Sequence, residues 1–347
     1  MKKAAMNLRD NWYVPVSALV LFVMQAGRSL TSVAEILAAF VVWVIICAVI
    51  PSSDLRKSSA ESGIGLKIFS GLTALGVCVY SAEALAEKVI EHPQILVRLH
   101  MPPGMFLCVS LAVSLLAFLS VYMFVIYFWR RLLGVIDSGG LLRDAGRYEL
   151  AFYVLMFAVS ASWMTLVFLR TNVFYDAPGY NVVYSSDSSG LVMGNCFLRL
   201  THPENDIRQP LFAVFSIPFM GLPYLAGKLL SLFVGHGRLL TALFMNDVQT
   251  AMLLAGIYIL GRAMRLSEPR RVLFAAFFAC SYVYLLALVM MEQYIVAFFW
   301  LAMAVYSVCN DSCDDRMILH GAGGTLTPSL FVTPLYLCGW GQNYLGG

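Results

Sequence analysis

Long apolar runs, separated by shorter polar stretches, recur along most of the chain. An α-helix needs about 20 apolar residues, within a range of roughly 17–25, to cross the hydrocarbon core of a bilayer. The apolar runs come close to this length, so the pattern predicts about nine membrane-spanning helices. The predicted spans are 12–28, 32–50, 66–85, 105–129, 149–169, 246–261, 272–290, 293–309 and 318–338. We therefore expect an all-α, polytopic transmembrane helical bundle.

Basic residues cluster in alternate connections, and this asymmetry sets the expected orientation. Lys2, Lys3 and Arg9 precede the first span, so we expect the N-terminus in the cytoplasm. The first apolar run lacks a clean small-residue cleavage site, so we interpret it as a retained span. The later basic clusters follow after every second span and fall on the same side. The span 149–169 then leads outward, which places the loop 170–210 outside the cytoplasm.

The apolar segment 211–234 is ambiguous. Four residues that weaken a helix interrupt it: Pro218, Gly221, Pro223 and Gly227. They favour a broken helix. A crossing here would also move the next basic cluster, at Arg262–Arg271, out of the cytoplasm. We therefore expect an in-plane or re-entrant helix on the outer surface, with a real crossing as the alternative.

The composition excludes several classes of protein. Of the 347 residues, 60% are hydrophobic and only 12% are charged. A soluble chain carries about twice that share of charge, so an ordinary soluble enzyme, a disordered chain and a disulfide-stapled secreted domain are excluded. The net charge of +3 argues against a nucleic-acid partner and leaves membrane lipids as the surroundings. We divide the chain into an N-terminal region of about four helices, 1–147, and a region 148–347 that carries the outer loop.

The loop contains the main concentration of chemically active side chains. It begins at the end of a predicted helix and holds Asp176, Asp187, His202, Glu204, Asp206 and Arg208. Carboxylates at such a position can meet a lipid-borne substrate at headgroup depth and are hydrated enough to ionise. Structural interpretations remain open for several of them. Asp187 between serines also suits a turn or a helix cap, and His202-Pro203 suits a loop turn.

The order of elements in 148–338 resembles the GT-C superfamily of membrane glycosyltransferases, which includes the protein O-mannosyltransferases and the lipid A aminoarabinose transferases. Tyr184–Asp187 resembles the acidic motif of the first outer loop. Arg208–Leu211 resembles the proline-containing element that follows it, and Ile259–Arg262 closes a later helix before the basic turn. Many relatives are longer, so we interpret the chain as a fragment or a reduced version.

The resemblance implies transfer of a sugar from a polyprenyl-phosphate donor to an extracytoplasmic acceptor, in a bacterial inner membrane. It selects Asp187 as the base that deprotonates the acceptor. Arg208 and Arg199 are the candidates for the phosphate, because a guanidinium pairs with phosphate in bidentate fashion. Family members commonly have a paired acidic motif, whereas Asp187 is flanked by serines; this puts a divalent-metal role in doubt and leaves the metal as an open alternative. The further substrate-binding candidates are Tyr184, His202, Glu204, Asp206 and Glu292.

Polar residues in or beside the spans have structural interpretations as well. Asn246 and Asp247 stand at the start of a predicted span, where capping is the default. Glu83 and Glu149 invite a functional interpretation, but they can also lie at interfaces or pair with other helices. A transporter or lipid flippase is the alternative function, although the chain shows no internal repeat. A non-catalytic scaffold role for 1–147 is a third.

Overall fold

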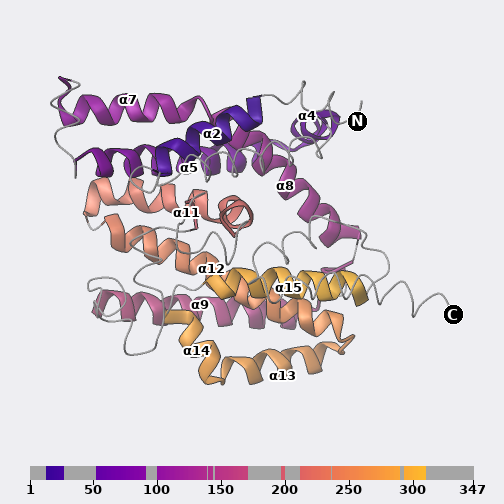
Figure 1. The fold of residues 1–347 in the computed structure, drawn as a ribbon. Helices are drawn as coiled ribbons and strands as arrows, with labels where there is room; N and C mark the ends of the chain where they lie inside the picture. Colours follow the sequence, from indigo (N-terminus) through magenta and orange to yellow (C-terminus); the bar gives the residue numbers. More distant parts are fainter. Residues whose placement is uncertain are drawn as a thin grey trace. The chain divides into compact units, whose positions relative to one another are not determined.

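The computed structural model describes residues 13–26, 52–90, 100–138, 140–143, 145–170, 197–199, 212–235, 237–289 and 293–309. Within these ranges every regular element is an α-helix (Figure 1). The helices are α2 (Tyr13–Ala26), α4 (Ser52–Glu61), α5 (Ile64–Ile90), α7 (Pro103–Leu115), α8 (Phe118–Ser138), α9 (Arg147–Arg170), α11 (Phe212–Val234), α12 (Gly237–Ala263), α13 (Glu268–Ala279), α14 (Tyr282–Val289) and α15 (Gln293–Cys309).

Five of the described helices are long and apolar enough to cross a membrane, namely α5, α8, α9, α11 and α12. The predicted all-helical class is confirmed for the described residues, and these five helices support an integral membrane protein. The number of nine spans stays a prediction, because the predicted spans 32–50 and 318–338 lie outside the described residues. The large outer loop stays a prediction for the same reason.

Two predicted spans are each divided into two helices. The run 105–129 is interrupted at Leu116–Ala117, between α7 and α8. The run 272–290 is interrupted at Cys280–Ser281, where the Ser281 hydroxyl accepts a hydrogen bond from the backbone N–H of Tyr284 at 3.1 Å. This bond caps the N-terminus of α14, so a polar residue inside an apolar run starts a new helix there.

Contacts divide the chain into two compact units. Unit 1 contains the helices up to Arg130 of α8, together with Leu198–Arg199 and the middle of α11, Ile217–Leu225. Unit 2 contains the end of α8, α9, the two ends of α11, and α12 to α15. The sequence-based boundary at residue 147 stays a prediction.

In unit 1, α5 and α11 approach each other closely at two glycines. A Cβ atom added to Gly76 would lie 1.9 Å from the carbonyl oxygen of Gly221. A Cβ atom added to Gly221 would lie 2.5 Å from the carbonyl oxygen of Thr73. The rings of Tyr80 and Tyr224 meet edge to face nearby, with centroids 5.4 Å apart. Small residues at such contacts let membrane helices pack backbone against backbone.

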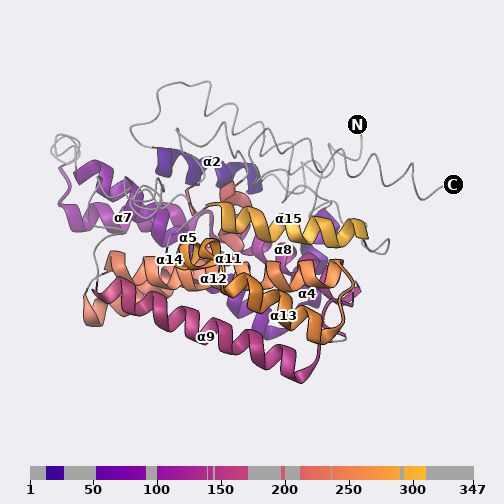
Figure 2. The same ribbon diagram turned by 90° about the horizontal axis from the view of Figure 1, so that it is seen from below.

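In unit 2, α9 and α12 run antiparallel, and Figures 1 and 2 show them side by side from two directions. Near the start of α9, the ring of Tyr153 meets that of Tyr258 at 5.5 Å. Near its end, Met164 contacts Asn246. The arginine-bearing start of α9 therefore lies at the same end of unit 2 as the arginine-bearing end of α12. The side of the membrane that this end faces stays a prediction.

The helix α11 differs from the sequence-based expectation. It continues unbroken through Pro218 and Pro223, so the predicted broken helix is wrong. Proline removes a backbone donor, but neighbouring helices make prolines tolerable in membrane segments. Here every residue from 212 to 221 is buried, and within unit 1 the Trp129 indole donates to the Pro218 carbonyl at 3.0 Å. The dense packing compensates for the lost backbone bonds.

The contacts of α11 within unit 2 also argue against an in-plane placement. Near its C-terminal end, Gly227 packs against the backbone of Thr241 at the start of α12. Near its N-terminal end, the ring of Phe215 lies 5.3 Å from that of Trp300 in α15. Since Phe298 of α15 meets Gly256 of α12, this second contact lies toward the other end of α12. α11 thus runs alongside α12 in the opposite direction, as a crossing helix would.

An exposed ion pair joins α8 to α4 in unit 1. Arg130 donates to the carboxylate of Glu61 and to the carbonyl oxygen of Lys57, the latter at 3.0 Å. The hydrogen bond from Arg130 lowers the pKa of Glu61 below its ordinary value of 4.5. Because the folded-state pKa is depressed, the pair stabilises the fold above the unfolded pKa. This stabilisation is lost as the pH falls through the folded pKa.

Replacing Arg130 by methionine is therefore expected to raise the pKa of Glu61 toward its ordinary value. The measurement is an NMR titration of the Glu61 side-chain carboxyl in micelles. Salt at 0.5 M should shrink the difference between the two proteins, because exposed charges are screened. An unchanged Glu61 titration in the variant would contradict this assignment.

Candidate functional site

Of the sequence-predicted site residues, only Arg199 falls within the described part of the chain. The others lie outside the described residues: Tyr184, Asp187, His202, Glu204, Asp206, Arg208 and Glu292. The roles of these other residues stay predictions.

Arg199 follows a buried, non-helical stretch that is hydrogen-bonded to α2 in unit 1, and the same α2 side chain is hydrogen-bonded to α5. Leu198 is fully buried, and its carbonyl oxygen accepts a hydrogen bond from Nε2 of Gln25 at 3.3 Å. The same Nε2 donates to the Ser81 hydroxyl at 2.8 Å. Ser81 in turn donates to the Val77 carbonyl at 2.9 Å within α5. Non-helical backbone beside apolar helices needs such partners, because lipid supplies none.

The guanidinium of Arg199 has an unused hydrogen-bonding group. The side chain is half-buried, and its Nε is buried without a hydrogen-bond partner among the described residues. A buried donor on a cation is costly to leave unpaired. An anion removes this cost, and phosphate or carboxylate matches the planar guanidinium best. The local structure is therefore suited to holding an anionic group.

A carboxylate lies two residues beyond Ser81 on the same helix. Glu83 is half-buried, and its Oε2 accepts a hydrogen bond from the Tyr224 hydroxyl at 2.6 Å. Gln25 is in the last turn of α2, and Ser81 and Glu83 are in the C-terminal part of α5. We call Gln25, Ser81 and Arg199 the Arg199 cluster; Glu83 is a separate acid of the same unit. Hydrogen bonds connect the Gln25 amide to the Ser81 hydroxyl and to the backbone immediately before Arg199.

Sequence reasoning identified one member of this cluster and missed two. Arg199 was predicted as a phosphate ligand, and Glu83 was recognised as an acid within a span. Gln25 and Ser81 were missed, although a polar side chain inside an apolar run is a signal for buried interactions. Gln25 donates to the backbone next to Arg199, and Ser81 accepts the second hydrogen bond of the same amide.

Two further polar groups belong to unit 2. Glu149 accepts two hydrogen bonds from Arg271, one from Nε and one from an Nη, both at 2.6 Å. Arg271 also donates to the Leu266 carbonyl at 2.7 Å. The side chains of Glu149 and Arg271 are 0% and 6% exposed, so the pair is a closed structural contact between α9 and α13.

The prediction that Asn246 and Asp247 cap a helix is wrong, because α12 begins at Gly237.

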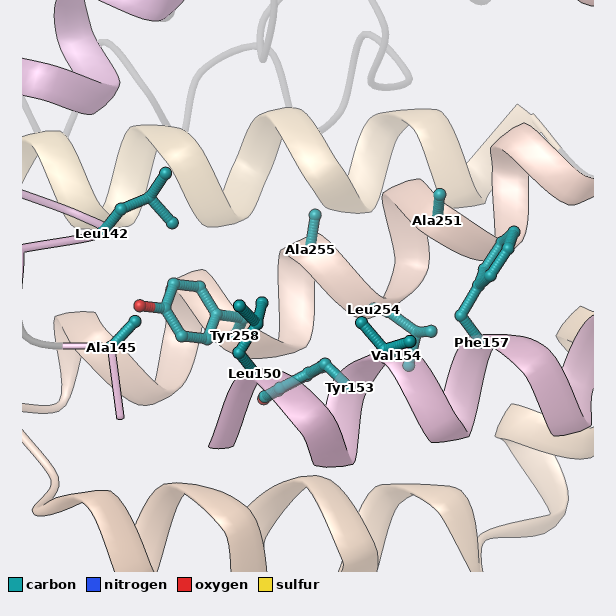
Figure 3. Close-up of a pocket in the computed structure, with 10 residues that line it drawn as sticks. All are labelled: Leu142, Ala145, Leu150, Tyr153, Val154, Phe157, Ala251, Leu254, Ala255 and Tyr258. Atoms are coloured by element: carbon teal, nitrogen blue, oxygen red, sulfur yellow. The ribbon is translucent and has the colours of Figure 1, made fainter. Parts of the chain in front are cut away.

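An apolar cavity of about 300 Å³ lies between α9 and α12 in unit 2 (Figure 3). Its lining residues are Leu142, Ala145, Leu150, Tyr153, Val154, Phe157, Ala251, Leu254, Ala255 and Tyr258. The lining contains no charged side chain, and the Tyr258 hydroxyl already donates to the Leu141 carbonyl at 2.7 Å. The cavity suits an apolar chain, and its lining carries only two side-chain hydroxyls, those of Tyr153 and Tyr258. It also adjoins the start of α9, away from Arg170, where the predicted outer loop begins.

Comparisons of the chain with protein-family models, with curated proteins and with solved structures found no match.

Proposed function

We propose that the chain is a membrane glycosyltransferase that moves a sugar from a polyprenyl-phosphate donor to an acceptor outside the cytoplasm. The observation that carries the proposal is Arg199, the predicted phosphate ligand in the described part of the chain. Its guanidinium has a buried donor without a described partner, and Gln25, which is also bonded to Ser81, donates to the backbone carbonyl beside it. The five apolar helices supply the membrane setting that a polyprenyl chain requires.

The reaction follows from the chemistry of the donor. Asp187 takes the proton from the acceptor hydroxyl or amine, and the acceptor atom forms a bond to the anomeric carbon of the sugar. The bond between that carbon and the phosphate oxygen breaks with its electron pair, which leaves polyprenyl phosphate. Arg199 and Arg208 stabilise the negative charge that develops on this leaving group.

The test uses the full chain in proteoliposomes with radiolabelled polyprenyl-phosphate mannose or polyprenyl-phosphate aminoarabinose. A lipid and protein extract of bacterial membranes supplies acceptors. Replacing Arg199 by glutamine is expected to lower the rate of transfer by about 10²–10³-fold, as for removal of one donor to a developing oxyanion. Replacing Asp187 by asparagine should lower it by about 10²–10⁴-fold. Product is measured by thin-layer chromatography.

The matched control is Arg143→Gln, because Arg143 is an exposed arginine in unit 2, outside the Arg199 cluster. It should transfer sugar at the wild-type rate. Absence of transfer from both donors by folded wild-type protein overturns the proposal. Wild-type rates in the R199Q variant would remove Arg199 from the mechanism.

A membrane transporter or lipid flippase is the second candidate function. It is favoured by the polar side chains of Asn246 and Asp247 within the apolar length of α12, since transporters bind substrates near the midplane. Movement of a fluorescent phospholipid between the leaflets of proteoliposomes, without sugar transfer, would favour it over the transferase.

A further inference from the structure

Oxygen-bearing side chains inside the apolar helix α12 include those of Asn246, Asp247 and Thr250. Asn246 is fully buried, and Thr250 is 1% exposed. Between them in sequence, Asp247 is half-buried, and its Oδ1 is buried. Asp247 follows the start of α12, Gly237, by ten residues, or about 15 Å at 1.5 Å per residue. In a helix that crosses a hydrocarbon core of roughly 30 Å, that distance is about half of the core.

None of these three oxygens has a hydrogen-bond partner among the described residues. The unpartnered atoms are Oδ1 of Asn246, Oδ1 of Asp247 and Oγ1 of Thr250. Asp247 also forms no ion pair with the described part of the chain, so no described cation balances its charge. Each unsatisfied polar atom is costly at this depth, and a carboxylate without a counter-charge costs most.

The helical geometry places Thr250 one turn from each of the other two residues, which are its i−4 and i−3 neighbours. Successive residues of an α-helix are about 100° apart, so Thr250 falls in azimuth between Asn246 and Asp247, about 6 Å further along the axis. The amide of Asn246 is oriented by its nitrogen, which donates to the Leu288 carbonyl at 2.7 Å and contacts Met164. Its oxygen is therefore left available as an acceptor.

The chemistry of this set selects its ligand. A carboxylate, an amide oxygen and a hydroxyl are the hard oxygen donors that alkali and alkaline-earth cations prefer. One carboxylate neutralises one positive charge, so a divalent ion would leave a net charge inside the apolar bundle. A proton on Asp247 would remove the charge, but it would satisfy fewer of the three acceptors.

We propose that Asn246, Asp247 and Thr250 form a binding site for a monovalent metal cation, Na⁺ or K⁺, within α12. The site lies in unit 2 and is independent of the proposed transferase activity. Occupancy would satisfy all three oxygens and neutralise the half-buried carboxylate, so it should stabilise the folded protein.

The probes are ²²Na⁺ and ⁸⁶Rb⁺, the latter as a substitute for K⁺, added to the purified full chain in detergent with N-methyl-D-glucamine as the background cation. Saturable binding of at least one probe is expected, with a stoichiometry near one per chain. Replacing Asp247 by asparagine should weaken binding at least tenfold. Replacing Thr250 by valine should weaken it measurably. The two probes distinguish which cation the site takes.

The matched control is Thr165→Val on α9, because the Thr165 hydroxyl donates within its own helix, to Ala161 at 2.7 Å. This variant should bind like the wild type. Folding of each variant is checked by circular dichroism, and T250V carries the test if D247N fails to fold. The proposal is overturned if the folded wild type binds neither probe saturably, or if T250V and T165V bind alike.

Discussion

Replacing Arg271 by methionine is expected to lower the free energy of unfolding by about 3–5 kcal/mol. Glu149 is fully buried and receives two hydrogen bonds from Arg271 at 2.6 Å. Removing the guanidinium leaves a carboxylate without a counter-charge in a site that water does not reach. The loss is measured as the shift in a denaturation curve of the protein in mixed micelles.

A neighbouring arginine supplies the control for this prediction. Arg270 is exposed, and R270M should change stability by less than about 0.5 kcal/mol, as is usual for surface substitutions. The double variant E149M/R271M should recover most of the lost stability, because both charges disappear together. If R271M were no less stable than R270M, the pair would contribute nothing to the fold.

Replacing Gly76 by alanine is expected to lower the free energy of unfolding by about 1–3 kcal/mol, the usual cost of overpacking. The added Cβ would lie 1.9 Å from the Gly221 carbonyl oxygen, a backbone atom that no side-chain rotation can move. α5 and α11 must then separate within unit 1. Thermal unfolding, monitored by circular dichroism in detergent, measures the effect.

The same helix contains the matched position for this test. A Cβ atom added to Gly71 of α5 would meet nothing within 4 Å. G71A should therefore be neutral or stabilising, since alanine is the better helix former by about 0.5–1 kcal/mol. Equal stability of G76A and G71A would mean that the close approach of α5 and α11 does not contribute to folding.

The sequence was informative about the class of structure because apolar run length maps directly onto helix length. It was less informative where tertiary packing decides whether a helix continues and where it begins. Pro218 and Pro223 predict a break for an isolated helix, yet dense burial keeps α11 continuous. Asn246 and Asp247 were read as a helix start because polar residues usually end an apolar run. Their position inside α12 depends on neighbours that lie far away in sequence.

The candidate site around Arg199 shows the same limit of sequence-based prediction. The resemblance to a glycosyltransferase family pointed to Arg199 among several charged residues of one loop. It could not identify Gln25, which is 173 positions away from Leu198 and hydrogen-bonds to its carbonyl. Such partners depend on which helices lie side by side, and hydropathy along a single chain does not contain that information.

The helix α9 also determines how the protein fits the thickness of its bilayer. It begins at Arg147 and ends at Arg170, and both arginines are exposed. Their separation along the axis is about 35 Å at 1.5 Å per residue, against a hydrocarbon core of roughly 30 Å. Both side chains can reach the headgroups of opposite leaflets while the helix stays nearly upright. In a markedly thinner bilayer, α9 would have to tilt, and the helices packed on it would have to tilt with it.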